Sequence, residues 1–219
     1  MSFISEIGPF IPSLWNGFLT TAAVSAASIV GSFAVGTGLA VLATYGGRVA
    51  ATAATLYIEL FRNISFLVLI FFFYFGLPEL GIFISAFWTG VLVLSLAVGA
   101  YVADAISAGL TNVQSGVKDA AIAFGLTPAQ RIRLLELPLA LRVSLRPLGS
   151  LFVNLILTTS ILSTITLSEL TSAAKIVAST TFRPFEVYFL LLILYSILTY
   201  LCSLIVHRMH RRANRFLAT

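Results

Sequence analysis

Charge is the scarcest property of this 219-residue chain. Only 10% of its residues are Asp, Glu, Lys or Arg and 59% are hydrophobic, whereas soluble domains carry about 25% charged residues. Cysteine occurs once, at Cys202, which excludes an internal disulfide and is expected to be a small packing residue. The sequence also lacks a P-loop and a metal-ligand cluster. These deficits indicate a protein whose solvent is lipid and which performs no chemistry itself.

Long uncharged stretches predict where the chain crosses the membrane. Each of four stretches exceeds the roughly 18–20 residues that a spanning helix needs: residues 15–47, 80–103, 147–168 and 187–206. A fifth apolar run, at 63–78, is long enough only if its helix begins near Ala50 and carries Glu59 and Arg62 into the membrane. The sequence therefore predicts a single all-α transmembrane domain over residues 1–219. Its five spans are expected at about 14–45, 50–77, 82–107, 145–166 and 186–206.

Basic residues predict the orientation of these spans. With the N-terminus outside and the C-terminus inside, ten Lys and Arg residues fall in inner segments and only Lys175 and Arg183 in outer ones. The net charge of +5 is thus explained by topology and does not imply nucleic acid binding. The N-terminus has no basic segment or small-residue cleavage site, so the first span is expected to be an anchor. Gly31, Gly36 and Gly38 predict close packing of that span on protein.

Residues 105–146 form a polar island between the third and fourth predicted spans. Apolar residues recur there at the spacing of one helix face: Val113, Val117, Ala120, Ala121 and Phe124. Gly125 stands where a left-handed residue would end that helix. Thr127 can cap a second helix, with Pro128 in its first position and Gln130 completing a capping box. The pattern predicts two helices joined by a short turn.

The second island helix is expected to run to Leu137, where Pro138 would end or kink it. The product is a helix–turn–helix of about 25 residues at the inner membrane face, within a loop of about 108–144. Ala120 and Ala121 would give this surface a low profile that fits a groove on a partner protein. The alternative is a pair of amphipathic helices that rest on lipid.

The island's spacing resembles the Glu-Ala-Ala-x3-Gly-x9-Ile-x-Leu-Pro motif of permease subunits from ABC importers. Here the motif residues are Asp119-Ala120-Ala121, Gly125, Leu135 and Leu137-Pro138, with Asp in place of Glu and Leu in place of Ile. Four further patches resemble the polar amino acid branch of that family: residues 59–62, 73–78, 100–104 and 181–188. The similarity covers roughly residues 14–208.

The resemblance implies a role for the island and a set of partners. In the family this loop is a coupling helix that sits in a cleft of the ATPase subunit. The matching residues are Asp119, Ala120, Ala121, Phe124, Gly125 and Leu126. The implied partners are two cytoplasmic ABC ATPase subunits, a second permease and an extracytoplasmic substrate-binding protein, at a bacterial inner membrane. ATP and Mg²⁺ would bind the ATPase subunits, and alternating access would move the substrate.

The fourth predicted span carries a polar stripe: Asn154, Thr158, Thr159 and Ser160. It fits either a substrate path or hydrogen bonds between helices. Amino acid permeases of this type often carry Gly-Asn-Glu and Lys-Asp-Thr-Ser in this span, but their acidic positions fall here on Leu151 and Thr158, and their lysine on Leu157. Either the chain is the non-binding half of a heterodimeric pore, which we favour, or its ligand lacks a cationic group that needs that contact.

Three ionisable residues are expected at membrane depth, where burial of a charge is costly unless it is paired. Glu59 and Arg62 are three residues apart, which predicts a salt bridge on one helix face, with a gating role as the alternative. Asp104 is expected to neutralise a neighbouring Arg. A rival interpretation is a membrane scaffold that docks a cytoplasmic partner without forming a pore. An intramembrane enzyme would need a catalytic companion for Asp104 or Glu59, and no suitable spacing supplies one.

Overall fold

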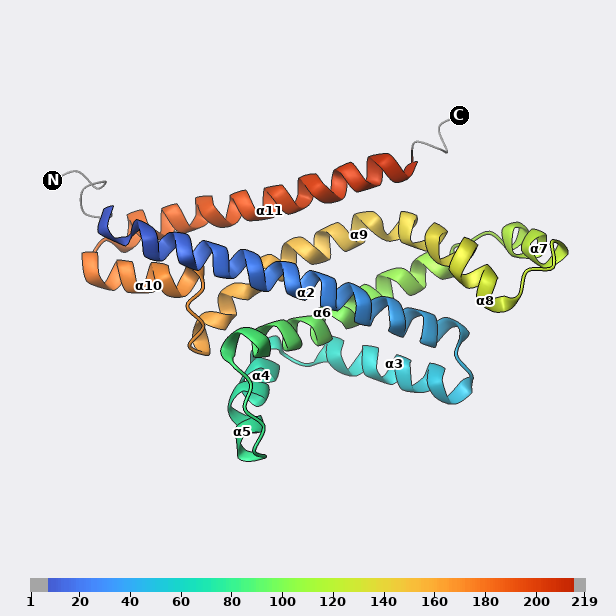
Figure 1. The fold of residues 1–219 in the computed structure, drawn as a ribbon, viewed down its shortest axis with the longest axis horizontal. Coiled ribbons are helices and arrows are strands. Elements are labelled where there is room, and N and C mark those ends of the chain that lie inside the picture. The colour runs from blue at the N-terminus through green and yellow to red at the C-terminus, as the bar shows by residue number, and fades with distance from the viewer. Residues whose placement is uncertain (1–7, 215–219) are drawn as a thin grey trace. The chain divides into compact units, whose positions relative to one another are not determined.

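The computed structural model describes residues 8–214, and over that range every regular element is a helix (Figure 1). Four helical segments are long and apolar enough to cross a membrane: Ile11–Tyr45, Ala86–Thr111, Pro128–Thr164 and Pro184–Arg212. The broken pair Arg48–Asn63 and Phe66–Glu79 makes a fifth if it counts as one span. The predicted all-α membrane fold is confirmed. Its residues cluster into two compact units, and each long helix contributes to both.

The first unit contains residues 1–31, 64–95 and 152–202, of which the first seven are outside the described residues. Its helices are the first part of α2 (Ile11–Tyr45), α4 (Phe66–Phe71), the π-helix Phe72–Gly76, α5 (Leu77–Glu79), the start of α6 (Ala86–Thr111), the end of α9 (Leu137–Thr158), the 3-10 helix Thr159–Thr164, α10 (Leu170–Thr181) and most of α11 (Pro184–Asn214). A short 3-10 turn, Gly8–Phe10, precedes α2.

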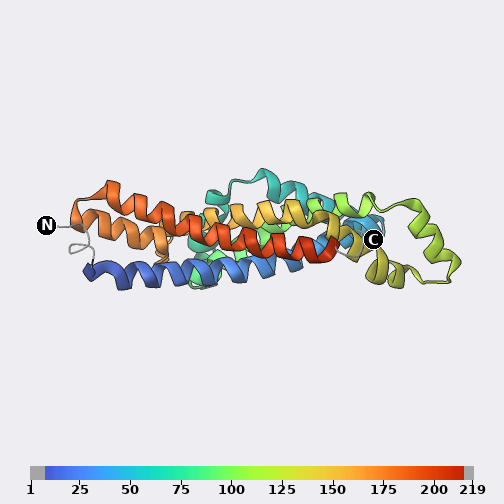
Figure 2. The same ribbon diagram turned by 90° about the horizontal axis from the view of Figure 1, so that it is seen from above.

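Helix α10 packs against the beginning of α2 and of α11 (Figures 1 and 2). Its buried face is built of small residues, including Ala173, Ala174 and Val177, which meet Leu14. A Cβ atom added at Gly17 would lie 3.0 Å from the Leu170 Cα, so α2 lies directly against the α10 backbone. The short outer helix that the sequence predicts after Ser168-Glu169 is thus a packed element.

Glu169 begins α10 and is fully buried. Its carboxylate accepts backbone N–H bonds from Thr171 (2.9 Å) and Ser172 (2.8 Å), which satisfies the open N-terminus of the helix. The Tyr195 hydroxyl donates to the same carboxylate at 2.9 Å, and that of Thr21 at 3.4 Å. Burial raises the pKa of Glu169 above its ordinary value, although these hydrogen bonds oppose the shift.

This raised pKa predicts a pH-dependent stability. The folded protein keeps the Glu169 proton at pH values where the unfolded chain has lost it. The contribution of Glu169 to stability is therefore greatest below its ordinary pKa of 4.5 and falls as pH rises toward the folded pKa. Glu169→Gln removes this titration and should flatten the dependence. Thermal unfolding of the purified protein in detergent, followed between about pH 4 and pH 8, checks this. Identical slopes for both proteins would show that Glu169 does not contribute.

The second unit contains residues 32–63, 96–151 and 203–219, of which the last five are outside the described residues. Its own helices are α3 (Arg48–Asn63), α7 (Ser115–Ala123), α8 (Pro128–Arg131) and the π-helix Ile132–Glu136. Helices α2 and α6 approach closely here, because a Cβ at Gly36 would lie 2.8 Å from the Gly99 carbonyl oxygen and would strike Val102. The predicted close packing of the first span is therefore present at Gly36, whereas a Cβ at Gly38 would meet nothing within 4 Å.

Gly36→Ala should destabilise the protein by about 1–3 kcal/mol, since the added methyl group has backbone in its way. Gly38→Ala is a matched control two residues along the same helix, because a Cβ there meets nothing within 4 Å. That change should be neutral or stabilising by up to about 1 kcal/mol, from helix propensity alone. Thermal unfolding midpoints in one detergent measure both. Equal midpoints would contradict the close contact of α2 with α6.

The helix that begins at Pro128 continues to Thr164, through Pro138 and Pro147. Of the two alternatives for Pro138, that it ends the island helix is therefore wrong, and that it kinks the helix stays a prediction. The five residues before Leu137 form a π-helix, Ile132–Glu136. A proline cannot donate to the carbonyl four residues earlier, and a π-bulge is a common way for a helix to absorb such a local irregularity and continue. The second island helix and the fourth span are one helical segment.

Candidate functional site

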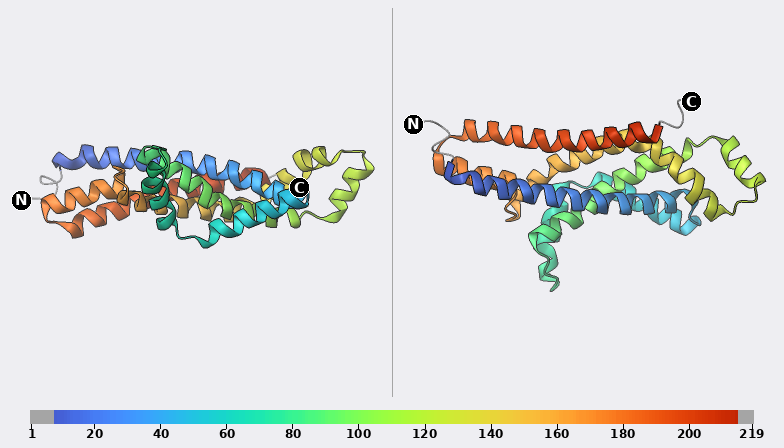
Figure 3. Two further views of the ribbon diagram at one scale, coloured as in Figure 1. Left: turned by 90° about the horizontal axis from the view of Figure 1, so that it is seen from below. Right: turned by 45° about the horizontal axis from the view of Figure 1, so that its top comes forward.

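Helices α7 and α8 form a hairpin between α6 and α9, which we call the α7–α8 hairpin (residues 115–131; Figures 2 and 3). Gly125 lies at its turn with φ +74°, the left-handed conformation that the sequence predicts. The amide of Gly125 donates to the Ile122 carbonyl at 2.9 Å, and that of Leu126 to the Ala121 carbonyl at 3.1 Å. These bonds close the end of α7 and reverse the chain.

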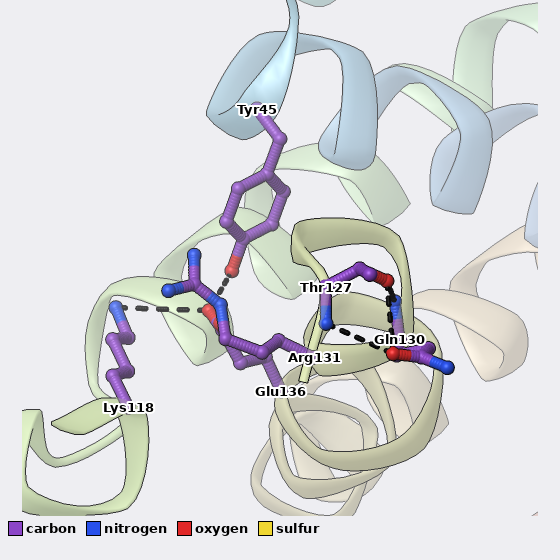
Figure 4. Close-up of polar contacts among 6 residues, drawn as sticks. All are labelled: Tyr45, Lys118, Thr127, Gln130, Arg131 and Glu136. Atoms are coloured by element: carbon purple, nitrogen blue, oxygen red, sulfur yellow. Dashed lines mark hydrogen bonds and ion pairs between the residues drawn. The ribbon is translucent and has the colours of Figure 1, made fainter. Parts of the chain in front are cut away.

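The start of α8 is held by the predicted capping box (Figure 4). The Thr127 amide donates to the Gln130 side-chain oxygen at 2.9 Å, and the Gln130 amide donates back to the Thr127 hydroxyl at 3.4 Å. Pro128 occupies the first turn, where its missing N–H has no cost. The turn is therefore fixed at both ends by local bonds.

The hairpin presents much of the predicted coupling set to the outside. Four of the six residues are exposed: Asp119, Ala120, Phe124 and Gly125. Phe124 is 86% exposed, an unusual position for a ring of that size. Ala121 is only 3% exposed, so the expectation that it joins Ala120 in a surface for a partner groove is wrong. Ala121 lies on the side of α7 that packs on the chain itself, and Leu126 is half-buried.

A buried carboxylate ties the hairpin to the rest of its unit. Glu136 is 1% exposed, and its carboxylate accepts a hydrogen bond from the Tyr45 hydroxyl at the end of α2. It also contacts the Arg131 Nε at 3.6 Å and the Lys118 Nζ at 3.9 Å (Figure 4). We call Tyr45, Lys118, Arg131 and Glu136 the Glu136 cluster. It joins α2, α7, α8 and the π-helix through one negative charge.

Glu136 occupies the unspecified position between Leu135 and Leu137 of the sequence motif, and motif reasoning missed it. One signal was available, a single acidic residue five positions after Arg131 in a basic and apolar helix. Positions five apart lie about 140° apart around an α-helix, so that spacing does not predict a contact. The π-helix Ile132–Glu136 has i→i+5 bonding and brings the two side chains onto one side.

The predicted polar stripe of the fourth span uses its hydroxyls mainly within its own helix. Thr158 donates to the Asn154 carbonyl at 2.8 Å, Thr159 to that of Ile156 at 2.6 Å, and Ser160 to that of Leu157 at 2.8 Å. Thr159 is also fully buried, while Asn154 is exposed. Such back-bonding satisfies a hydroxyl within its own helix. Thr158 and Ser160 thus bond within their own helix, whereas Thr159 also bonds Tyr195 of α11, as the alternative of hydrogen bonds between helices predicts.

Of the charged residues expected at membrane depth, Asp104 pairs with an Arg as predicted, but Glu59 does not within residues 8–214. Arg62 contacts Asp104 at 3.1 Å, which joins α3 to α6. The expected Glu59–Arg62 bridge is not the contact found in the described residues, so that prediction is wrong. The Tyr101 hydroxyl donates to the Arg62 carbonyl at 3.0 Å, and the guanidinium lies 5.6 Å from the Tyr101 ring centre. Tyr101 and Asp104, one helical turn apart, draw Arg62 toward α6.

Comparison with known proteins places these features in a family. Residues 34–216 match the model of the "binding-protein-dependent transport system inner membrane component" family. The chain is 34% identical over 200 residues to the "probable glutamine ABC transporter permease protein GlnM" of Bacillus subtilis, covering 91% of this chain and 93% of that one. It is 32% identical over 210 residues to the glutamine transport system permease protein GlnP of Escherichia coli, covering 95% and 96%.

Solved structures agree with the fold. A crystal structure of an amino acid ABC transporter with histidines matches with a TM-score of 0.85 at 30% identity, over 97% of this chain and 99% of that one. A structure of the MetNI methionine ABC transporter shares the fold, with a TM-score of 0.82 at 21% identity over 98% and 100% of the two chains. The chain belongs to the family of binding-protein-dependent transport system inner membrane components.

Proposed function

We propose that this chain is the transmembrane permease subunit of an ATP-driven ABC importer for polar amino acids. The observation that carries the proposal is the α7–α8 hairpin, which is fixed internally by Gly125 and the capping box yet leaves Phe124 86% exposed. A large exposed aromatic residue on a rigid element is typical of the anchor of a protein interface. The glutamine permeases and the histidine-containing transporter structure among the relatives support the substrate class.

In this proposal the hairpin sits in a cleft of a cytoplasmic ABC ATPase subunit. The ATPase dimer binds ATP and Mg²⁺, closes, and displaces the hairpin. Two features of the structure support transmission of that motion. Helix α8 is continuous with the fourth span as far as Thr164, and the Glu136 cluster joins the hairpin to the end of α2. The spans then alternate between outward-open and inward-open states.

The proposal includes the orientation and partners that the sequence indicates. The N-terminus is outside and the C-terminus inside, so that the hairpin faces the ATPase subunits. The complex contains a second permease, two ATPase subunits and an extracytoplasmic binding protein. The fourth span lacks carboxylates where related permeases carry them, at Leu151 and Thr158. We therefore assign this chain to a heterodimeric pore in which the other permease supplies those fourth-span contacts.

Reconstitution tests this function directly. The permease, its partner permease and the ATPase subunits are placed in proteoliposomes with the binding protein, and uptake of radiolabelled L-glutamine, L-glutamate, L-histidine and L-arginine is followed. We expect uptake of at least one of them that requires ATP and the binding protein. A membrane scaffold would bind the ATPase subunits without any uptake, and that result would overturn the proposal.

A further inference from the structure

Helix α3 carries a stripe of polar residues along one side. Positions i, i+4, i+7, i+11 and i+14 lie on one face of a helix, and in α3 they are all polar and all exposed: Arg48, Thr52, Thr55, Glu59 and Arg62. The opposite side of the helix is apolar and includes buried Ala54 and Ile58. We call the five residues the α3 stripe.

Lipid is an unsuitable cover for this stripe. Charged groups within a membrane span face protein or a water-filled cavity, because exposure to hydrocarbon is costly. Directly after Asn63 the helix is interrupted at residues 64 and 65, and non-helical backbone at membrane depth is likewise tolerated only in protein or beside water. A groove of about 420 Å³ follows the stripe and is lined by Ala51, Thr52, Thr55, Leu56 and Glu59. The polar side of α3 therefore borders space that this chain does not fill.

The stripe ends at two opposite charges. The Arg62 and Asp104 side chains contact each other at 3.1 Å and remain 40% and 56% exposed. Tyr101 fixes the Arg62 end through its bond to the Arg62 carbonyl and its ring contact with the guanidinium. An α-amino acid at neutral pH carries a carboxylate and an ammonium group on the same carbon. A guanidinium and a carboxylate side by side match both groups of such a zwitterion, with the guanidinium able to hold the carboxylate through two bonds.

We propose that the α3 stripe lines the inner half of the translocation pathway and that Arg62 and Asp104 bind the carboxylate and ammonium groups of a zwitterionic α-amino acid. This inference rests on the proposed transport function. The Thr52 and Thr55 hydroxyls bond the Arg48 and Ala51 carbonyls of their own helix. The polarity that suits water and solute along the α3 stripe is therefore carried chiefly by Glu59 and by the Arg62–Asp104 pair near the helix break. A helix of another subunit could cover the stripe only if it buried several charges opposite in sign to Arg48, Glu59 and Arg62.

In this inference the chain is not the non-binding half that the sequence favours. It holds the carboxylate and ammonium groups that all α-amino acids share, while the fourth-span contacts that it lacks at Leu151 and Thr158 come from the other permease.

Thiol labelling tests the pathway. In a Cys202→Ala background, Thr55→Cys is treated in inside-out membrane vesicles with a membrane-impermeant cationic thiosulfonate. We expect labelling at least tenfold faster than at Leu60→Cys, which is 53% exposed on the same helix but lies off the stripe. If Thr55→Cys is unreactive, and an oxidant instead links it to another permease chain, the stripe is a subunit interface and the pathway assignment is wrong.

Protection by ligand tests the pair. L-Glutamine, L-glutamate, L-histidine and L-arginine are each added before labelling of Thr55→Cys, and the most protective is compared with its α-amide and its deamino analogue. We expect protection by the amino acid and at least tenfold weaker protection by either analogue. Arg62→Gln and Asp104→Asn should each weaken protection at least tenfold and leave labelling without ligand within twofold, whereas Asp104→Glu should retain it.

Two results would overturn the binding site. One is the absence of protection by all four amino acids, and the other is undiminished protection in Arg62→Gln and Asp104→Asn, which would make the pair purely structural. Labelling needs neither ATP nor uptake. Failure of reconstituted wild-type transport therefore counts against the proposed function, whereas unreactive Thr55→Cys in a transporting complex counts against this inference alone.

Discussion

Glu136→Gln should reduce ATP-driven uptake about thirtyfold, with the permease still inserted in the membrane. The substitution keeps the shape of the side chain but removes the one negative charge that Lys118 and Arg131 share. Loss of one partner of a buried ion pair costs several kcal/mol. Because the Lys118 and Arg131 side chains are 34% and 23% exposed, we expect the loss of the ion pairs to cost less, about 2 kcal/mol of coupling free energy between the ATPase and the spans. That free energy corresponds to about a thirtyfold change in the coupled equilibrium, and hence in uptake.

The same substitution at Glu186 provides a matched control. Glu186 pairs with Arg183 at 3.5 Å, but its side chain is 37% exposed. Loss of this ion pair should therefore cost only about 0–1 kcal/mol of free energy, and Glu186→Gln should leave uptake nearly unchanged. Tyr45→Phe removes only the hydroxyl that bonds Glu136, so its loss of uptake should lie between those of Glu186→Gln and Glu136→Gln. Uptake and ATPase activity are measured together in proteoliposomes. If uptake is normal in Glu136→Gln while unfolding occurs at a lower temperature, the Glu136 cluster contributes to stability and does not transmit motion.

Phe124→Ala should weaken binding of the ATPase subunits to the permease about thirtyfold or more. The ring is 86% exposed at the turn of the hairpin, and truncation of an aromatic anchor at an interface typically costs about 2 kcal/mol or more. Within the described structure the ring has little burial to lose, so folding should be unaffected. Co-purification of ATPase subunits with tagged permease, titrated over ATPase concentration, measures the change.

Phe83→Ala is the control for this prediction. Phe83 is 83% exposed, in the segment between α5 and α6 that the proposed topology places outside. The two substitutions remove the same ring from equally exposed positions, so they differ only in location. Phe83→Ala should leave ATPase binding unchanged. Equal weakening by both substitutions would indicate a general effect on the permease, and no weakening by either would remove Phe124 from the interface.

The sequence predicted features that local chemistry determines. Gly125 adopts its left-handed conformation, and Thr127 with Gln130 forms the capping box, because each depends on neighbouring residues alone. The all-α fold followed from long apolar stretches in the same way. These predictions needed no knowledge of distant contacts.

Features that depend on distant contacts were missed. Glu136 meets Tyr45 across 91 positions of sequence, and a π-helix is needed before it can meet Arg131. Arg62 was expected to pair with Glu59 on its own helix. Its guanidinium pairs with Asp104 of α6 instead, and its carbonyl accepts a hydrogen bond from Tyr101 of the same helix. Ala121 belongs to the periodic apolar face, and the sequence could not show that its own chain covers it.

A single cross-linking measurement tests the central claim that the α7–α8 hairpin docks the ATPase subunit. A photoreactive maleimide is attached at Ala123→Cys, an exposed position beside Phe124 at the end of α7, in a Cys202→Ala permease that keeps the Phe124 ring. The complete transporter is assembled in membranes and illuminated, and the products are identified by mass spectrometry. The account predicts a covalent adduct with the ATPase subunit, at a yield that changes when ATP is added. Adducts with lipid or the extracytoplasmic binding protein, and none with the ATPase subunit, would contradict it.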